Sequence, residues 1–369
     1  MKKFLWITVI GSVVAALAAN GAPQPLAAPA SLAQAPCDCS KLKTLQIELR
    51  NALRLQQAFR NKIAELRTMN GDSAQGALKV FAEGEARRGL ETIPDYKGPS
   101  EFDYVPWGQN QRTFNFPNEQ LCGMSNSARE KFDQAVAASG CPGIGAALRA
   151  HEEVHHNRCR SSGYKAYLGM HGADRAQEEV EAYGAQIKVL RAEIAKVLEH
   201  ANVRIETETN SRLEMPPNPL YTALVVENRA VVPMTSVSVS GEVIKFDGEG
   251  KQTNDAKVEG HCKFTGGLPF TLTLRGSIET DGLEAQIRLA VQGTHPSMFM
   301  ECTTPQGKGH GMSIPVNVSG GTIPVMNLPL ENGAEKVFDQ STGEGAKMMA
   351  GSGVRITGTS KIRLIFCEK

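Results

Sequence analysis

One short stretch of the chain, Ala146 to Cys159 (AALRAHEEVHHNRC), combines residue types that can bind a metal ion and move a proton. In a helix, His151 and His155 would lie one turn apart on the same face, so that both imidazoles can bind a single ion. Glu152 would lie beside them, where a carboxylate can act as a general base. The spacing therefore predicts a metal site with its own general base, and these are the groups that hydrolysis requires.

The residues around this pattern favour the helix that it needs. The segment from Ala146 to Ala150 consists mainly of strong helix formers. Pro142 and two glycines stand just before it, which is typical of the start of a helix. The two histidines are thus expected to project from one face of a regular helix.

Two histidines alone do not make a catalytic zinc site, which normally has three protein ligands and one open position. The next strong helical pattern begins at about Asp174, and its predicted buried stripe contains Val180, Tyr183 and Ile187. Three carboxylates lie within one turn of this second helix. The sequence therefore offers a third ligand, and the choice among the three carboxylates depends on the rotation of the helix.

The sequence HEEVH resembles the motif of the zincin superfamily of metallopeptidases, and EVEA, beginning at Glu179, resembles the Glu-x-x-Ala pattern of its gluzincin branch. The resemblance covers the two helices only. It implies that Zn²⁺ is bound by His151, His155 and Glu179. Glu178 and Glu181 stay open as alternatives, because each residue turns a helix by about 100° and small differences in rotation exchange their places.

The same resemblance implies a mechanism. Glu152 would remove a proton from a zinc-polarised water that attacks a peptide carbonyl, and would return the proton to the leaving amine. Tyr183, one turn beyond the expected third ligand, is the candidate for stabilising the oxyanion. Tyr164 and Tyr167 are alternatives for that role, and His171 is a weaker alternative metal ligand.

The elements that must position this site are helical, and those that follow it are strands. Periodicity predicts two helices ahead of the motif, over residues 40–69 and 74–88, which would either cover or buttress the cleft. After Ala201 apolar and polar residues alternate between Gly, Asn, Asp and Pro turns. We therefore predict an α+β protein with a mainly helical zincin-like domain followed by an all-β sandwich or barrel.

The N-terminus predicts export. Lys2 and Lys3 precede an apolar stretch that ends in a small-residue cleavage site, so residues 1–18 are interpreted as a signal peptide and the Ala/Pro-rich residues 19–36 as a tether. The predicted domains then cover residues 37–203 and 204–369. We expect a secreted or periplasmic protein whose mature chain has no integral membrane segment.

The eight cysteines form an even set, which in an exported chain favours disulfides over thiolate metal sites. Cys141 and Cys159 flank the motif, and a straight helix between them would hold them about 18 Å apart. They are therefore expected to pair with other cysteines, with Cys122, Cys37 or Cys39 as the candidates. Such bridges would clamp the ends of the motif helix.

The charge balance argues against nucleic acid as a partner. Removing Lys2 and Lys3 changes the formal net charge from +1 to −1. The expected partner is a peptide or protein substrate, and the predicted function is that of an exported zinc metallopeptidase. Two alternatives stay open: a secreted or surface binding or adhesion protein with a non-catalytic zincin-like scaffold, and a peptidase toxin or effector.

Overall fold

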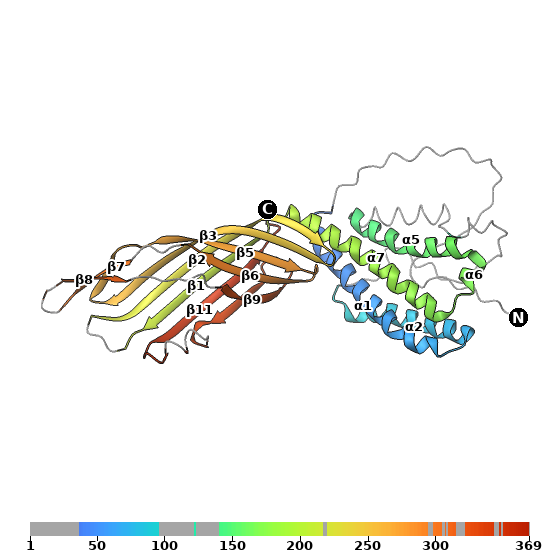
Figure 1. Cartoon of the computed structure of the whole chain (residues 1–369), viewed down its shortest axis with the longest axis horizontal. Helices are drawn as coiled ribbons and strands as arrows, with labels where there is room; N and C mark the ends of the chain where they lie inside the picture. Colours follow the sequence, from blue (N-terminus) through green and yellow to red (C-terminus); the bar gives the residue numbers. More distant parts are fainter. Residues whose placement is uncertain are drawn as a thin grey trace, which may run out of the picture. The chain divides into compact units, whose positions relative to one another are not determined.

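The chain divides into two compact units, Met1–Val197 and Leu198–Lys369, shown as a computed structural model in Figure 1. The predicted signal peptide and tether, residues 1–18 and 19–36, lie outside the described residues. The structure describes residues 37–95, 122, 140–216, 220–293, 298–304, 307, 309–314, 322–342, 347 and 350–368.

The first unit is helical, as the sequence predicts. The motif helix begins earlier than its strong helix formers, at Pro142, because proline at the first helical position has no backbone N–H to leave unsatisfied. Its described helices are α1 (Leu42–Arg67), α2 (Gly71–Thr92), α5 (Pro142–Ser162), α6 (Tyr164–Leu168) and α7 (Gly172–Glu199), preceded by the 3₁₀ turn Cys39–Lys41.

The predicted helical hairpin is present as α1 and α2. Asn70 caps the second helix, since its Oδ1 accepts a hydrogen bond from the backbone N–H of Ser73 at 3.0 Å. Arg54 and Glu85 form an ion pair between the two helices. The apolar face of α1 is buried along its whole length, through Leu42, Leu45, Leu49, Ala52, Leu55, Phe59, Ile63 and Leu66.

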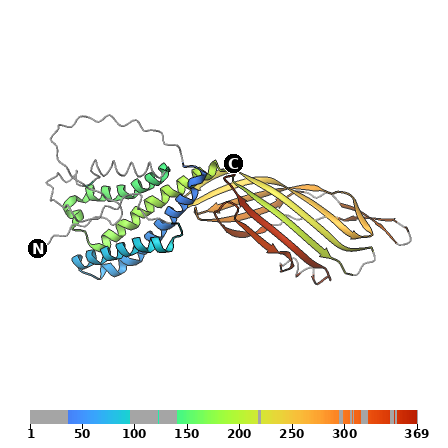
Figure 2. The ribbon, with the colours of Figure 1, turned by 180° about the vertical axis from the view of Figure 1, so that it is seen from behind.

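Helix α7 lies between α5 on one side and α1 on the other, and the views in Figures 1 and 2 agree on this arrangement. Phe59 of α1 stacks on Tyr183 of α7, with ring centroids 5.9 Å apart. On the opposite side, a Cβ on Gly143 of α5 would lie 2.4 Å from the Glu193 side chain, so the absence of a side chain permits the close approach of α5 and α7. The hairpin therefore supports α7, which carries the candidate third ligand.

Both ends of α5 are held by disulfides. Cys37 pairs with Cys141 at the start of the helix, and Cys122 pairs with Cys159 near its end. This confirms the expectation that Cys141 and Cys159 bond to other cysteines. None of the eight cysteines is free. The disulfides are compatible with a protein that works outside the cytoplasm.

The second unit is built from antiparallel strands. Cys262 and Cys302 face each other on neighbouring strands and form a disulfide. The described strands are β1 (Arg204–Glu214), β2 (Tyr221–Ser240), β3 (Val243–Gly260), β4 (Cys262–Gly266), β5 (Phe270–Thr280), β6 (Glu284–Gln292), β7 (Met298–Thr303), β8 (Gly309–Ile314), β9 (Thr322–Pro329), β10 (Glu335–Asp339) and β11 (Arg355–Ile365).

Eight of these strands form one sheet in the order β10-β11-β1-β2-β3-β5-β6-β9, which curves until it is nearly closed. Strands β4, β7 and β8 form a second, three-stranded sheet. Every second residue of each strand lies on the inner face of the large sheet, and these residues form its core. A Cβ on Gly276 of β5 would lie only 3.1–3.2 Å from Leu289, Val232 and Ile205, so strands from different parts of the sheet meet at this glycine.

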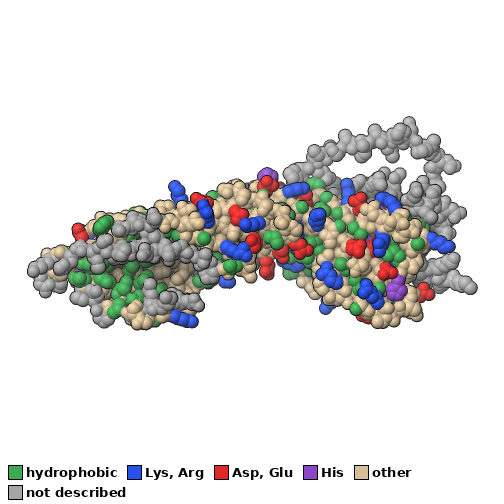
Figure 3. Space-filling model, in the orientation of Figure 1, with side chains coloured by type: hydrophobic (Ala, Val, Ile, Leu, Met, Phe, Trp, Pro, Cys, Tyr) green, Lys and Arg blue, Asp and Glu red, His purple; other side chains and the backbone are tan. Residues whose placement is uncertain are grey.

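The outer face of the same sheet is charged. Cross-strand ion pairs join Arg212 to Glu259 and Arg288 to Glu279, and at the surface each such pair contributes little to stability. On the face in Figure 3, basic and acidic side chains are interspersed. The α+β class is thus confirmed. Among the described residues, none of the helices is long and apolar enough to cross a membrane.

The unit boundary lies slightly before the predicted one at residues 203 and 204. Ala201 and Val203 precede the first strand but belong with the sheet, because their carbonyls accept hydrogen bonds from the backbone N–H groups of Cys367 and Met234. Both residues are buried. The alternation of apolar and polar residues marks where the first strand begins. It does not mark the residues just before the strand, which pack with the sheet.

Candidate metal centre

Three predicted ligands converge between α5 and α7. His151 Nε2 and His155 Nε2 are 3.2 Å apart. Glu179 reaches across from α7, with Oε2 3.5 Å from His151 Nε2 and Oε1 3.6 Å from His155 Nε2. All three side chains are buried. The group could hold a metal ion.

The separation of the two imidazole nitrogens fits a tetrahedral metal. With metal–ligand bonds of roughly 2.0–2.1 Å, neighbouring tetrahedral ligand atoms lie about 3.3–3.4 Å apart. The two imidazole nitrogens, 3.2 Å apart, are close to that value, and Glu179 presents a different carboxylate oxygen to each of them, at 3.5 and 3.6 Å. In addition, Glu179 Oε2 is buried without a hydrogen bond of good geometry among the described residues. A buried carboxylate oxygen in this position is suited to a cation.

The charges around the site favour a protonated His155 when no metal is bound. Burial by itself lowers the pKa of His155, but the charges of Glu179, Glu178 and Glu152 outweigh it and raise this pKa to about 9. Burial lowers the pKa of His151, although Glu179 opposes the effect. Burial would raise the pKa of Glu179, but the two histidines and Arg175 lower it. Without metal, a protonated His155 therefore neutralises the Glu179 carboxylate.

The helix rotation separates the three candidate carboxylates. Glu179 faces the histidine Nε2 atoms, whereas Glu178 lies on the other side of His155, with Oε1 2.9 Å from Nδ1. Glu181 is exposed and accepts a hydrogen bond from Gln177 at 3.3 Å. The structure therefore brings Glu179 together with His151 and His155, and leaves Glu181 on the surface.

His171 is held by the backbone and does not join the group. Its Nε2 lies 3.0 Å from the Met69 carbonyl, and its Nδ1 accepts a hydrogen bond from the Ala173 N–H at 3.2 Å. A ring with Nε2–H as donor and Nδ1 as acceptor satisfies both contacts. Its role in the described structure is to fix the start of α7.

Glu152 and Tyr183 both lie close to the ligands. Glu152 is 5% exposed and near enough to His155 to favour the protonated imidazole. Tyr183 is 1% exposed, and its ring packs edge-on against His151 with centroids 4.6 Å apart. Packing accounts for the position of this ring, and its role at an oxyanion stays a prediction. Tyr164 is half-buried and packs beside the Cys122–Cys159 disulfide.

Sequence reasoning missed the surroundings of Glu178. The sequence offers Tyr167 as an alternative residue for stabilising the oxyanion, yet in the structure its hydroxyl donates to Glu178 Oε1 at 3.0 Å. Arg175 is marked by no motif in the sequence, and its Nη1 lies 3.6 Å from Glu178 Oε2. The three residues come from α6 and two turns of α7. No local pattern marks them, because the contact depends on how α6 folds back.

Comparison with known proteins found no match. No known protein family matches the chain, and neither a curated protein nor a solved structure does.

We expect metal binding to this site to release about one proton near pH 7, because His155, with a pKa of about 9, must lose its proton to coordinate. The apparent affinity should then rise by up to roughly tenfold per pH unit from pH 7 to 9. Calorimetric zinc titrations in buffers of different ionisation enthalpy measure the released proton. Release of no proton at pH 7 would contradict the prediction.

The same pKa fixes the direction of the stability change. A histidine whose pKa is higher in the folded than in the unfolded protein stabilises the fold fully below about pH 6.5. This contribution is lost as the pH rises through about 9. Metal-free protein should accordingly unfold more easily at pH 9.5 than at pH 7, as measured by urea denaturation, and zinc should reduce the difference.

Proposed function

We propose that the chain is an exported zinc-dependent metallopeptidase of the zincin type. The observation that carries the proposal is the convergence of three buried side chains, two imidazoles and the Glu179 carboxylate, with the buried carboxylate of Glu152 next to His151 in the same helix. Two imidazoles and one carboxylate are a donor set used by catalytic zinc, which keeps a further position open. Export is supported by the disulfides.

Zn²⁺ held by His151, His155 and Glu179 would supply a Lewis acid that makes water acidic and polarises a carbonyl. The residues of the chain would perform the proton transfers. Glu152 would accept the proton of the attacking water and deliver it to the leaving amine, so one carboxylate serves first as base and then as acid. His155 is held by Glu178 on the side away from Glu179, which leaves Nε2 facing the ligand cluster.

The proposal is tested with the full chain purified with its disulfides intact. We expect near-stoichiometric zinc and hydrolysis of an unfolded protein such as reduced casein. A zinc chelator should abolish hydrolysis, and added Zn²⁺ should restore it. Absence of zinc binding at neutral pH would refute the proposal, and tight zinc binding without any hydrolysis would favour a non-catalytic scaffold.

A further inference from the structure

Glu178 is adjacent to the candidate ligand Glu179 in the sequence but contacts the other nitrogen of His155. It is 2% exposed, and its Oε1 lies 2.9 Å from His155 Nδ1. A carboxylate at this position accepts the Nδ1–H hydrogen bond, so that a His155 ring that has lost one proton keeps the other on Nδ1 and has the lone pair of Nε2 directed at Glu179 and His151. Glu178 therefore selects the imidazole tautomer that can bind a cation.

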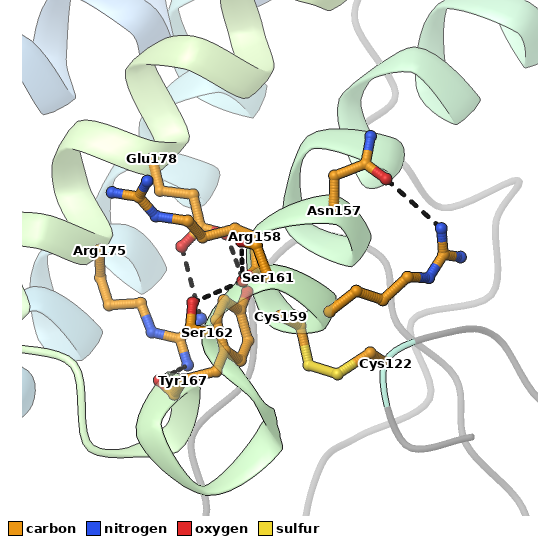
Figure 4. The surroundings of a disulfide bond; sticks show 10 residues. Cys122, Asn157, Arg158, Cys159, Ser161, Ser162, Tyr167, Arg175 and Glu178 are labelled. Carbon is orange, nitrogen blue, oxygen red and sulfur yellow. Dashed lines mark hydrogen bonds and ion pairs between the residues drawn. A yellow bond between two sulfur atoms is a disulfide. The ribbon is translucent and has the colours of Figure 1, made fainter. Parts of the chain in front are cut away.

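Glu178 is itself held by a hydrogen bond at Oε1 and faces a positive charge at Oε2. Tyr167 donates its hydroxyl to Oε1 at 3.0 Å, and Arg175 Nη1 lies 3.6 Å from Oε2. Arg175 also stacks over the Tyr167 ring at 3.5 Å, and its Nη2 donates to the Tyr167 carbonyl at 2.8 Å. A buried carboxylate needs such partners to stay charged. Figure 4 shows these side chains together beside the end of α5.

Tyr167 in turn is fixed by the second disulfide. Its side chain is 2% exposed and packs in one cluster with Cys122 and Cys159. Cys159 lies one helical turn beyond His155 on α5. The disulfide thus holds the tyrosine one turn of α5 beyond the histidine that Glu178 contacts.

We propose that Glu178 is the positioning residue of this metal centre, with Tyr167 and Arg175 as its supports. This inference rests on the proposed metal centre but not on peptidase activity. Glu178 acts through His155 and does not bind the ion. Histidines that bind a metal through one ring nitrogen commonly donate a hydrogen bond from the N–H of the other to a carboxylate. Loss of that partner weakens metal binding by roughly 10–100-fold.

The test is the zinc affinity of the full chain, measured by competition with a chromophoric chelator. Glu178→Gln keeps the size of the side chain and removes its charge, and we expect zinc binding about 10–100-fold weaker. The visible absorption spectrum of the Co²⁺-loaded variant should also differ from that of the wild type, because the imidazole ligand is altered. Glu181→Gln, an exposed carboxylate on the same helix, is the matched control and should change neither quantity.

Folded Glu178→Gln protein with wild-type zinc affinity and Co²⁺ spectrum would overturn the inference. If this variant does not fold, Tyr167→Phe decides, since it removes one oxygen from the same network. A loss of zinc affinity in Tyr167→Phe supports the inference, and unchanged affinity overturns it. Failure of the wild type to bind zinc would refute the metal centre and this inference together, whereas wild-type binding with unaffected variants refutes only the inference.

Discussion

Glu152→Gln should retain zinc and lose peptide hydrolysis by about 10²–10⁴-fold in kcat, the range by which general acid–base catalysis accelerates reactions. The amide of glutamine has nearly the shape of the carboxylate but accepts no proton at neutral pH. The proposed ligands His151, His155 and Glu179 are untouched by the change. Steady-state hydrolysis of a fluorogenic peptide, with zinc content measured on the same sample, separates the loss of the base from the loss of the metal.

Glu153→Gln is the matched control for this experiment. Glu153 is the next residue on α5 and is exposed, whereas Glu152 is buried. Both substitutions remove one negative charge from the same helix turn. We expect Glu153→Gln to hydrolyse peptides at the wild-type rate. If Glu152→Gln cleaves as fast as the wild type, then Glu152 is not the base and the proposed mechanism is wrong.

Glu179→Gln should lose zinc. The substitution removes the only carboxylate that faces both histidine Nε2 atoms among the described residues, at 3.5 and 3.6 Å. The expected loss of affinity exceeds the roughly 10–100-fold that follows from removing an outer-shell partner, because a direct ligand and its negative charge are weakened together. Zinc content after dialysis against a weak chelator measures the effect.

Substituting each of the three neighbouring carboxylates in turn gives a predicted ranking of zinc affinities. Zinc affinity should fall most in Glu179→Gln, less in Glu178→Gln and not at all in Glu181→Gln. Each variant removes one charge from the same turn of α7, so the change in net charge is the same for all three and cannot by itself produce this order. Zinc retained in Glu179→Gln and lost in Glu181→Gln would show that the ligand assignment is wrong.

Helix predictions succeeded where burial has a strong period. The apolar stripe of α1 recurs every three or four residues over the whole helix, and the observed helix, Leu42–Arg67, lies within the predicted residues 40–69. Strands were harder to identify. The positions of β1 that alternate with Ile205 are Thr207, Thr209, Ser211 and Leu213, so three polar residues in a row interrupt the apolar pattern. This strand is fixed by its pairing with β2 and β11.

The sequence predicted the two-helix site because its information is local. A spacing of four places His151 and His155 on one helix face in any straight helix, and Glu152 follows from adjacency. The disulfide clamp at both ends of α5 was also predictable in part, since helix length alone keeps Cys141 from Cys159. Local geometry therefore determined that the two histidines share one helix face and that Glu152 lies beside them.

Only the tertiary structure decided which carboxylate completes the group. Glu178, Glu179 and Glu181 are equivalent in helix propensity, and they differ only in how α7 is rotated against α5. That rotation is set by packing between distant segments, such as Phe59 on Tyr183 and Gly143 beside Glu193. The physical reason is that helix periodicity is encoded within one segment, whereas helix rotation depends on contacts between segments far apart in the chain.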